Sequence, residues 1–397
     1  MHAREIRPGV KLIASVHWER RLFDALIPLP DGTSYNAYLV EGSTATALVD
    51  TTDPELRDTL LDELDAVPSL DYVVSLHSEQ DHSGVIPDVL AKYPKAKVIS
   101  SMKAQELLMT QLHVAEDRIR VVDDGESISL GDKTLTFVST PWVHWPETMV
   151  AHLPESKILF SCDFFGSHLA TTNVYVTDKP QVYEAAKRYF AEIMMPFRHI
   201  IKKNLDKVAA LDFEVIAPSH GPLYDEPAFI VDAYRDWVSP QMKNEVVLPY
   251  VSMHGSTHQM VSYLIDALSR RGVTVNAFDL AVTDIGKLAI ALVDAATIIV
   301  GTPTVQFGPH PSVVYATYLA NLLRPKLKYA AIIGSYGWQS KAVDQIAAMI
   351  PNLKVEVLAT IMQKGLPTDE TFAELDQLAD AVAAAHAADE AVVVESQ

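Results

Sequence analysis

The run His77-Ser-Glu-Gln-Asp-His82 places four metal-capable side chains within six residues, directly after the strand-like stretch 71–76 (DYVVSL). In an extended segment alternate side chains point to the same side, so His77, Glu79 and Asp81 can face one cavity while His82 points differently. Polar residues at the end of a buried strand are typical of functional sites in α/β architectures. This run therefore predicts a metal site at a strand end of an α/β domain.

Three further candidates follow other strand-like stretches. His144 lies in TPWVHWP, Asp163 in LFSCDFFG and His220 in APSHGP. Any one of them alone is as well explained as a polar residue at a strand end. Together with the first run, however, they form a set of imidazole and carboxylate ligands that is better explained as a metal site.

The order of strand-like and helix-like stretches divides the chain into two halves. Up to about residue 240, short strands alternate with turns and with helical stretches such as 54–67 and 103–113, which indicates a layered α/β sandwich. From residue 246, continuous apolar strands alternate with helices, which is typical of a doubly wound parallel sheet. We place the domains at 1–243 and 244–397.

Three loops of the second half suit a phosphate-bearing flavin. The first, Ser252-Met253-His254-Gly255-Ser256-Thr257, offers hydroxyls and a close backbone approach at a helix N-terminus, where anions are favoured. It matches neither the ATP-binding nor the dinucleotide-binding glycine pattern. The other two loops also follow strands, where open α/β sheets bind ligands, and their candidate residues are Thr302, Pro303, Thr304, Val305, Gln306, Ser335, Tyr336, Gly337 and Trp338.

These motifs resemble the flavodiiron protein family, whose first half has the metallo-β-lactamase fold and whose second half is flavodoxin-like and holds FMN. Hydrolases of the first fold carry H-x-H-x-D-H and zinc, whereas Glu79 here occupies the place of the second histidine. A carboxylate is a harder ligand than imidazole and suits iron, which changes its oxidation state as zinc does not. The fold class implied is an α/β chain, with a metallo-β-lactamase-like αββα sandwich followed by a flavodoxin-like parallel sheet.

The resemblance also assigns the ligands of a non-haem diiron site. It gives His77, Glu79 and His144 to one iron, and Asp81 and His220 to the other, with Asp163 bridging the two. His82 is expected to contact the site without binding metal directly. The sequence departs from the family at Phe23-Asp24-Ala25-Leu26, because many members have a histidine there, and at His254, where aromatic residues are common.

The activity implied is the reduction of O2 to water, of NO to N2O, or of both, with electrons delivered through FMN. The electrons must come from a separate donor, such as rubredoxin, a flavin reductase or the reduced deazaflavin F420. The family resemblance also implies a head-to-tail homodimer or a dimer of such dimers. Two alternatives remain: a hydrolase of the metallo-β-lactamase fold, and an electron-transfer flavoprotein with a structural metal domain.

Composition excludes several other classes. The net charge of −19 disfavours nucleic-acid binding. The single cysteine, Cys162, cannot form an intramolecular disulfide or a cysteine-only metal centre, and we expect it to be a packed core thiol. The sequence contains neither a membrane-spanning apolar run nor a signal-peptide pattern, so we expect a cytoplasmic protein without membrane contact.

Overall fold

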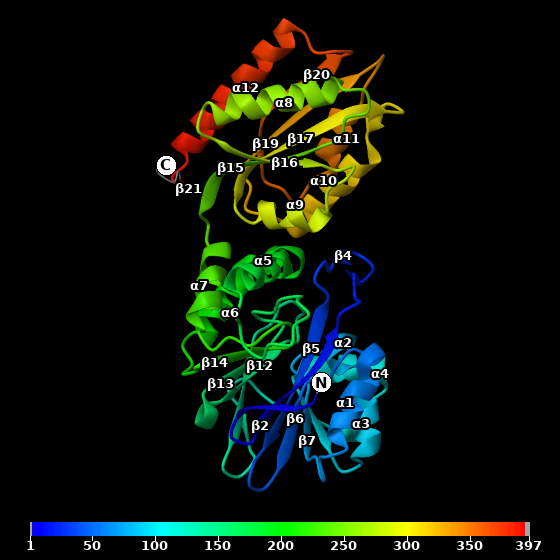
Figure 1. Cartoon of the computed structure of the whole chain (residues 1–397), viewed down its shortest axis with the longest axis vertical. Coiled ribbons are helices and arrows are strands. Elements are labelled where there is room, and N and C mark those ends of the chain that lie inside the picture. Colours follow the sequence, from blue (N-terminus) through cyan, green and yellow to red (C-terminus); the bar gives the residue numbers. More distant parts are fainter. Residues whose placement is uncertain (1, 394–397) are drawn as a thin grey trace. The chain divides into compact units, whose positions relative to one another are not determined.

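The computed structural model describes residues 2–393 and divides into two compact units (Figure 1). The first contains the chain up to Tyr189 together with Phe197–Val238, and the second contains Phe190–Pro196 and the chain from Ser239. Within the described residues, no helix has the length and apolar character needed to cross a membrane.

The first unit is built on two sheets. One has the strand order β1-β2-β5-β6-β7-β8-β9, antiparallel from β1 to β6 and parallel from β6 to β9. Its strands are β1 (Arg4–Arg7), β2 (Val10–His17), β5 (Thr33–Glu41), β6 (Thr46–Val49), β7 (Tyr72–Val74), β8 (Lys97–Ser100) and β9 (Ile119–Val121). A short hairpin, β3 (Leu22–Phe23) and β4 (Ile27–Pro28), lies between β2 and β5 in the sequence.

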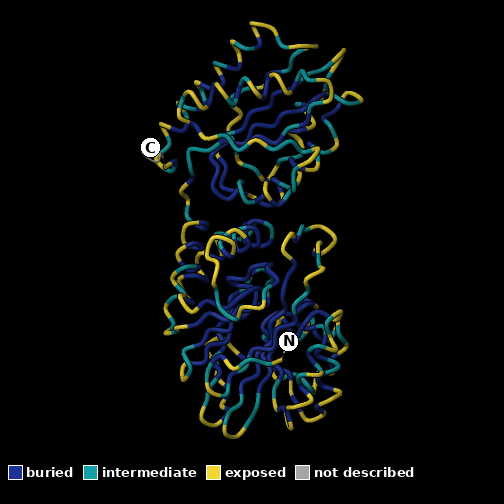
Figure 2. The backbone as a smooth tube through the Cα atoms, in the orientation of Figure 1, coloured by how far each residue is buried: buried dark blue, intermediate teal, exposed yellow. Residues whose placement is uncertain are grey.

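The second sheet runs in sequence order, and only its last two strands are parallel. Its strands are β10 (Ser127–Ser129), β11 (Thr134–Ser139), β12 (Met149–Leu153), β13 (Ile158–Cys162) and β14 (Val215–Pro218). A single buried cluster joins apolar residues of the first sheet, such as Leu12 and Val40, to Phe137 and Phe160 of the second. Figure 2 shows the strands of this unit as mostly buried.

Helices cover the outer sides of both sheets, which completes an αββα sandwich and confirms the predicted fold of this half. Figure 1 shows α1, α3 and α4 along one side of the unit and α6 and α7 along the other. A second buried cluster packs α1 and α3 on the first sheet through residues such as Leu60, Val89 and Leu48. The helices are α1 (Arg57–Leu64), α2 (Gln80–Ser83), α3 (Ile86–Lys92), α4 (Met102–Leu112), α5 (Lys179–Tyr189), α6 (Arg198–Val208) and α7 (Ala228–Trp237).

The second unit is the predicted doubly wound parallel sheet, with the order β16-β15-β17-β19-β20. Its main strands are β15 (Met242–Tyr250), β16 (Thr274–Asp279), β17 (Ala295–Val305), β19 (Tyr329–Tyr336) and β20 (Glu356–Lys364), with short additions β18 (Gly308–Pro309) and β21 (Val392–Val393). The chain passes from β15 to β16 on one side and then crosses to β17 on the other, so the loops after β15 and β17 lead to opposite faces and leave a crevice at the carboxyl ends of the strands.

Helices lie on both faces of this sheet, with α8 and α12 on one and α9 and α10 on the other (Figure 1). They are α8 (Ser256–Ser269), α9 (Ile285–Leu292), α10 (Pro311–Leu323), α11 (Ala342–Met349) and α12 (Asp369–Ala388). The buried face of α8, which includes Met260 and Leu264, packs with Leu378 of α12 in one apolar cluster.

A buried histidine ties the last turn of α12 to two central strands. His386 is 2% exposed, and its Nε2 lies 2.6 Å from Oγ1 of Thr297 on β17. Its Nδ1 lies 2.8 Å from Oδ1 of Asn244 on β15. Burial lowers the pKa of His386 from 6.5 to about 4, so the ring is neutral in the folded protein at neutral pH.

This depressed pKa predicts a loss of stability in mild acid. The unfolded chain takes up a proton near pH 6.5 and the folded chain only near pH 4, so His386 stabilises the fold fully above pH 6.5 and progressively less as the pH falls toward 4. The full effect is about 3 kcal/mol. Urea unfolding between pH 7.5 and 4.5 should show a shallower pH dependence for His386→Gln than for the wild type. The exposed His113→Asn variant should follow the wild type, and equal slopes in all three proteins would contradict the assignment.

Candidate metal and flavin sites

The predicted metal residues come from loops at the ends of four strands in the first unit. His77 and Glu79 follow β7, His144 follows β11, Asp163 follows β13 and His220 follows β14. The chain turns after Glu79, whose backbone is extended, and enters the helical turn α2 at Gln80. The expectation that His77, Glu79 and Asp81 share one side of an extended segment is therefore wrong, because Asp81 and His82 lie on the helical turn.

The first group consists of His77, Glu79, His144 and Asp163, whose ligand atoms lie within 4.8 Å of one another. Oε2 of Glu79 lies 3.1 Å from Nε2 of His77 and 3.0 Å from Nε2 of His144. Oδ2 of Asp163 lies 3.4 Å from each of the same two nitrogens. Two imidazole nitrogens and two carboxylate oxygens thus converge on one point.

The second group consists of Asp81, His82 and His220, and it approaches the other oxygen of Asp163. Oδ1 of Asp163 lies 3.3 Å from Nε2 of His220 and 3.0 Å from Nε2 of His82. The carboxylate of Asp81 lies 3.3 Å from the former nitrogen and 3.4 Å from the latter. His82 therefore lies among the candidate ligand atoms of this group, and the two oxygens of Asp163 approach one group each.

The buried carboxylates of this cluster favour positive charge beside them. Within the described residues, both carboxylate oxygens of Asp81 and of Asp163 are buried and make no hydrogen bond. Burial alone would lower the pKa of His144, but the carboxylates of Asp163 and Glu79 beside its ring outweigh this and raise the pKa to about 9. Asp163 and Asp81 likewise raise the pKa of His220 to about 10 against the effect of burial. Buried carboxylates that favour positive charge in this way fit a pair of metal ions.

Glu147 is a buried carboxylate that sequence reasoning missed. Its Oε1 accepts hydrogen bonds from Nδ1 of His77 at 2.7 Å and from the backbone N–H of Ser78 at 3.0 Å. The bond leaves Nε2 of His77 free to face the metal position and fixes the orientation of the ring. The signal was present in the sequence, since Glu147 follows His144 by three residues in the same loop.

Asp50 and Cys162 lie next to His82 of the second group. Ligand-type atoms of Asp50, His82 and Cys162 lie within 4.8 Å of one another. Asp50 accepts hydrogen bonds from the backbone N–H of Leu76 at 2.8 Å and from the hydroxyl of Ser219 at 3.1 Å. Cys162 belongs to the buried apolar cluster between the sheets, as expected for a core thiol.

Aromatic and imidazole rings enclose the second group. The ring of Tyr189 lies 5.7 Å from that of His220. Burial raises the pKa of Tyr189 well above its usual value, and the negative charge of Asp163 raises it further. His168 lies 4.8 Å from His220 and 5.2 Å from Phe23 of the β3–β4 hairpin. Asp24, at the exposed end of that hairpin, has a raised pKa because of partial burial and the negative charges of Glu79 and Asp81. The hairpin therefore lies within electrostatic reach of the cluster.

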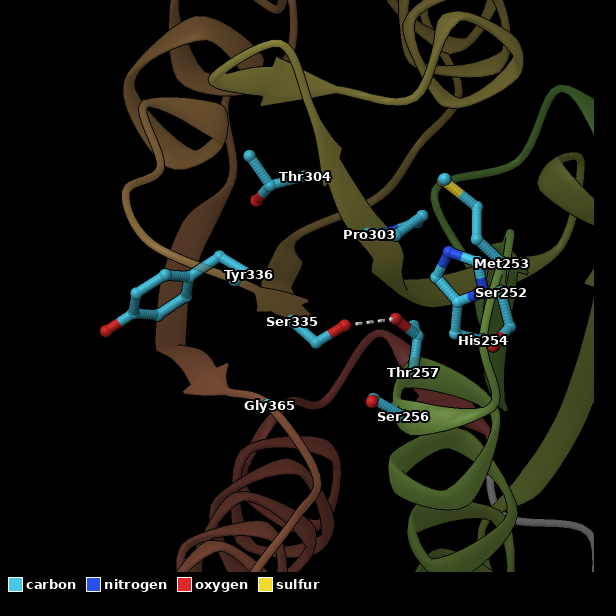
Figure 3. Close-up of a pocket in the computed structure, with 11 residues that line it drawn as sticks. Ser252, Met253, His254, Ser256, Thr257, Pro303, Thr304, Ser335, Tyr336 and Gly365 are labelled. Carbon is cyan, nitrogen blue, oxygen red and sulfur yellow. Dashed lines mark hydrogen bonds between the residues drawn. The ribbon is translucent and has the colours of Figure 1, made fainter.

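The second unit contains a cavity of about 200 Å³ at the carboxyl ends of its strands (Figure 3). Tyr336 lies on one side of it and Met253 and His254 lie on the other, with a hydrogen bond of 3.1 Å between the hydroxyls of Thr257 and Ser335. Its lining includes the predicted residues Ser252, Met253, His254, Ser256, Thr257, Pro303, Thr304, Ser335, Tyr336 and Gly337. None of the described residues that line it is acidic, which suits an anionic ligand in an acidic protein.

Several features fit a phosphate-bearing flavin. Gly255 caps α8 with a φ of 88°, and open space surrounds the position where a Cβ would stand, so the helix N-terminus is accessible to an anion. Five predicted residues do not line the cavity: Gly255, Thr302, Val305, Gln306 and Trp338, of which Trp338 is 77% exposed. Gly365, which does line it, was missed although it follows β20 at the same edge of the sheet.

Comparisons with known proteins agree with both halves. Residues 33–221 match the model of the ODP family beta lactamase. The chain is 33% identical to the nitric oxide reductase of Moorella thermoacetica (89% of this chain, 91% of that protein) and 30% identical to the coenzyme F420H2 oxidase of Methanothermobacter marburgensis (94% and 95%).

Two solved structures cover nearly the whole chain. The rubredoxin oxygen:oxidoreductase of Desulfovibrio gigas has a TM-score of 0.92 at 30% identity and covers 97% of this chain and 98% of its own. The flavodiiron protein of Giardia intestinalis has a TM-score of 0.90 at 27% identity, with 97% of each chain covered. The chain therefore belongs to the flavodiiron proteins, a family of oxidoreductases that carry FMN and a diiron site.

Proposed function

We propose that this protein reduces O2 to water, NO to N2O, or both, at a diiron site supplied with electrons by FMN. The observation that carries the proposal is the carboxylate of Asp163, whose two oxygens face two separate imidazole–carboxylate groups. When bound, two ferrous ions and a reduced FMN together supply the four electrons that convert O2 into two waters, and two of these electrons convert two NO into N2O and water.

The proposed ligands follow the two groups. His77, Glu79 and His144 would hold one iron and Asp81 and His220 the other, with the carboxylate of Asp163 shared between the two groups. The position of Nε2 in His82 supports direct binding to the second iron in addition to these ligands. Glu79 supplies an oxygen ligand where a zinc hydrolase has a histidine, which favours iron in this group.

The protein side chains around the ligands have distinct roles. Glu147 holds His77 with Nε2 toward the metal position. The backbone carbonyl of Ser34 accepts a hydrogen bond from Nδ1 of His220, which orients the second group in the same way. Tyr189 and His168 close the site from the side of His220 and exclude bulk water.

The FMN phosphate is proposed to bind at the N-terminus of α8, held by the hydroxyls of Ser252, Ser256 and Thr257. The proposed functional division of the chain stays at 1–243 for the diiron half and 244–397 for the FMN half. Gly255 and Gly365 leave room for the flavin, and Tyr336 offers an aromatic face for its ring.

Electron donor, assembly and location are part of the same proposal. The names of the relatives support rubredoxin or reduced F420 as the donor, and a flavin reductase is the alternative. A head-to-tail homodimer, or a dimer of such dimers, would bring FMN of one subunit to the diiron site of another. A cytoplasmic location would place the enzyme beside such donors.

The first experiment is the metal and flavin content of anaerobically purified protein, followed by turnover. We expect about two irons and one FMN per chain, with O2 or NO consumed when a reduced donor is present. Glu79→His and Asp163→Ala should abolish turnover, because each removes an oxygen ligand from a buried group. Asp124→Ala, which alters an exposed carboxylate paired with Lys207, should retain it. Wild-type rates in either site variant, or two zincs without flavin, would contradict the proposal.

A second prediction concerns Glu147. Its carboxylate contacts His77 and not the second group, so Glu147→Gln should weaken iron binding in the first group about 10–100-fold and spare the second. Anaerobic titration of the metal-free protein with ferrous iron should then resolve one tight and one weakened site. Glu126→Gln, which alters a partly exposed carboxylate paired with Arg120, serves as the control and should titrate like the wild type. Equal weakening of both sites would contradict the assignment.

A third prediction tests the phosphate position. Thr257→Val and Ser256→Ala should each weaken FMN binding by about 10-fold or more, because each removes a hydroxyl that bonds to a charged group. Fluorescence titration of the flavin-free protein measures this, with Ser269→Ala at the other end of α8 as the control. Riboflavin, which lacks the phosphate, should bind equally to all variants. An equal loss of riboflavin affinity would show that the hydroxyls do not contact the phosphate.

A further inference from the structure

A set of buried polar groups borders the second metal group on the side facing α1. Ser15 and His17 on β2 lie opposite Tyr35 and Thr33 on β5 in the antiparallel pairing, so their side chains share one face of the sheet. Thr51, in the loop after β6, bonds to the backbone carbonyl of His82 through both its N–H and its hydroxyl. These bonds fix the loop, which also carries Thr52 and Asp53, to the turn that carries Asp81.

Four polar atoms in this region have no protein partner. Across residues 2–393, neither Oγ of Ser15, Nδ1 of His17, Oη of Tyr35 nor Oγ1 of Thr52 makes a hydrogen bond, and each atom is buried. Ser15, Tyr35 and Thr52 are at most 1% exposed. Buried polar groups in native proteins are almost always hydrogen-bonded, and ordered water supplies the bond where the protein does not.

Tyr35 connects this region to the metal ligands. Its ring meets that of His220 edge-on at 5.5 Å between centroids. The hydroxyl of Tyr35 can both accept and donate a hydrogen bond, so it can pass on a proton by accepting one as it donates another.

The other end of the region reaches solvent. The side chain of Glu55 is 64% exposed, and its Oε2 lies 3.1 Å from Nη1 of Arg20 and 3.9 Å from Nε2 of His17. The backbone N–H of Glu55 donates to Asp53, which is 8% exposed, at 2.8 Å. Polar groups therefore run from an exposed carboxylate, through His17, along the sheet face shared with Ser15 and Tyr35, to the ring of His220.

We propose that water molecules bound by His17, Tyr35 and Thr52 form a path that conducts protons from Glu55 at the surface to the diiron site. The inference rests on the proposed function, because reduction of one O2 to two waters consumes four protons with its four electrons. Solvent supplies the protons through this path, and the external donor supplies the electrons through FMN. Tyr35 acts as a relay beside the ligands and is not itself a ligand.

The path can be tested without turnover. A crystal structure of the iron- and FMN-loaded wild type, at a resolution that shows ordered water, should place waters at roughly 2.7–3.2 Å from Oη of Tyr35 and Oγ1 of Thr52. Dry contacts at both atoms would overturn the proposal.

Kinetics supply the second test. Reduced protein mixed rapidly with O2 in H2O and in D2O should react more slowly in Tyr35→Phe, on the order of 10-fold, with a larger solvent isotope effect and unchanged iron and FMN content. Thr52→Val, which preserves shape, should act in the same direction and carries the test if the first variant loses iron. Tyr93→Phe is the control, because it removes a buried hydroxyl that donates to the backbone carbonyls of Leu64 and Val67. Its rate and its solvent isotope effect should match those of the wild type.

The two hypotheses fail in different ways. Wild-type rates and isotope effects in both Tyr35→Phe and Thr52→Val would overturn the path and leave the proposed function standing. A fully loaded wild type that consumes neither O2 nor NO would overturn the proposed function, whereas the waters in the crystal would still decide whether the path exists.

Discussion

The carboxylate of Asp163 is the contact on which the site depends, because both groups of imidazoles close on its two oxygens. Asp163 follows β13, a strand of the second sheet, whereas His77 and His82 come from the loop after β7 in the first. The site therefore forms only when the two sheets pack together. The apolar cluster between them, which includes Phe137 and Phe160, sets the positions of the loops that carry the ligands.

Much of this arrangement could be predicted from the sequence. Parallel strands of continuous apolar residues made the second unit recognisable, and its hydroxyl-rich first loop was correctly placed at the cavity. In the first unit, the candidate ligands each follow a strand, and strand ends gather at one edge of a sheet. Each of these patterns involves residues that are close together in the sequence, so a single sequence is enough to recognise it.

The structure differs from the prediction where the direction of a side chain matters and where residues far apart in the sequence make contact. The helical turn that begins at Gln80 moves Asp81 away from Glu79, although an extended chain would have kept the two on one side. Trp338 stays a predicted flavin contact, although of the two neighbouring aromatic residues it is Tyr336 that lines the cavity. The contacts of Tyr35 with His220, and of Asp50 with Ser219, join residues that are far apart in the sequence, so no local pattern could reveal them.

The dispersed origin of the ligands has a consequence for the life of the protein in a cell. An unfolded chain holds His77, His144 and His220 far apart, so it offers no site of comparable affinity, and metal binds the folded state almost alone. By mass action, every tenfold rise in free iron above the dissociation constant then adds about 1.4 kcal/mol for each iron site to the stability of the folded chain. Iron supply would thus set the amount of folded protein as well as its activity, and a cell short of iron would lose the enzyme to proteolysis instead of storing it empty.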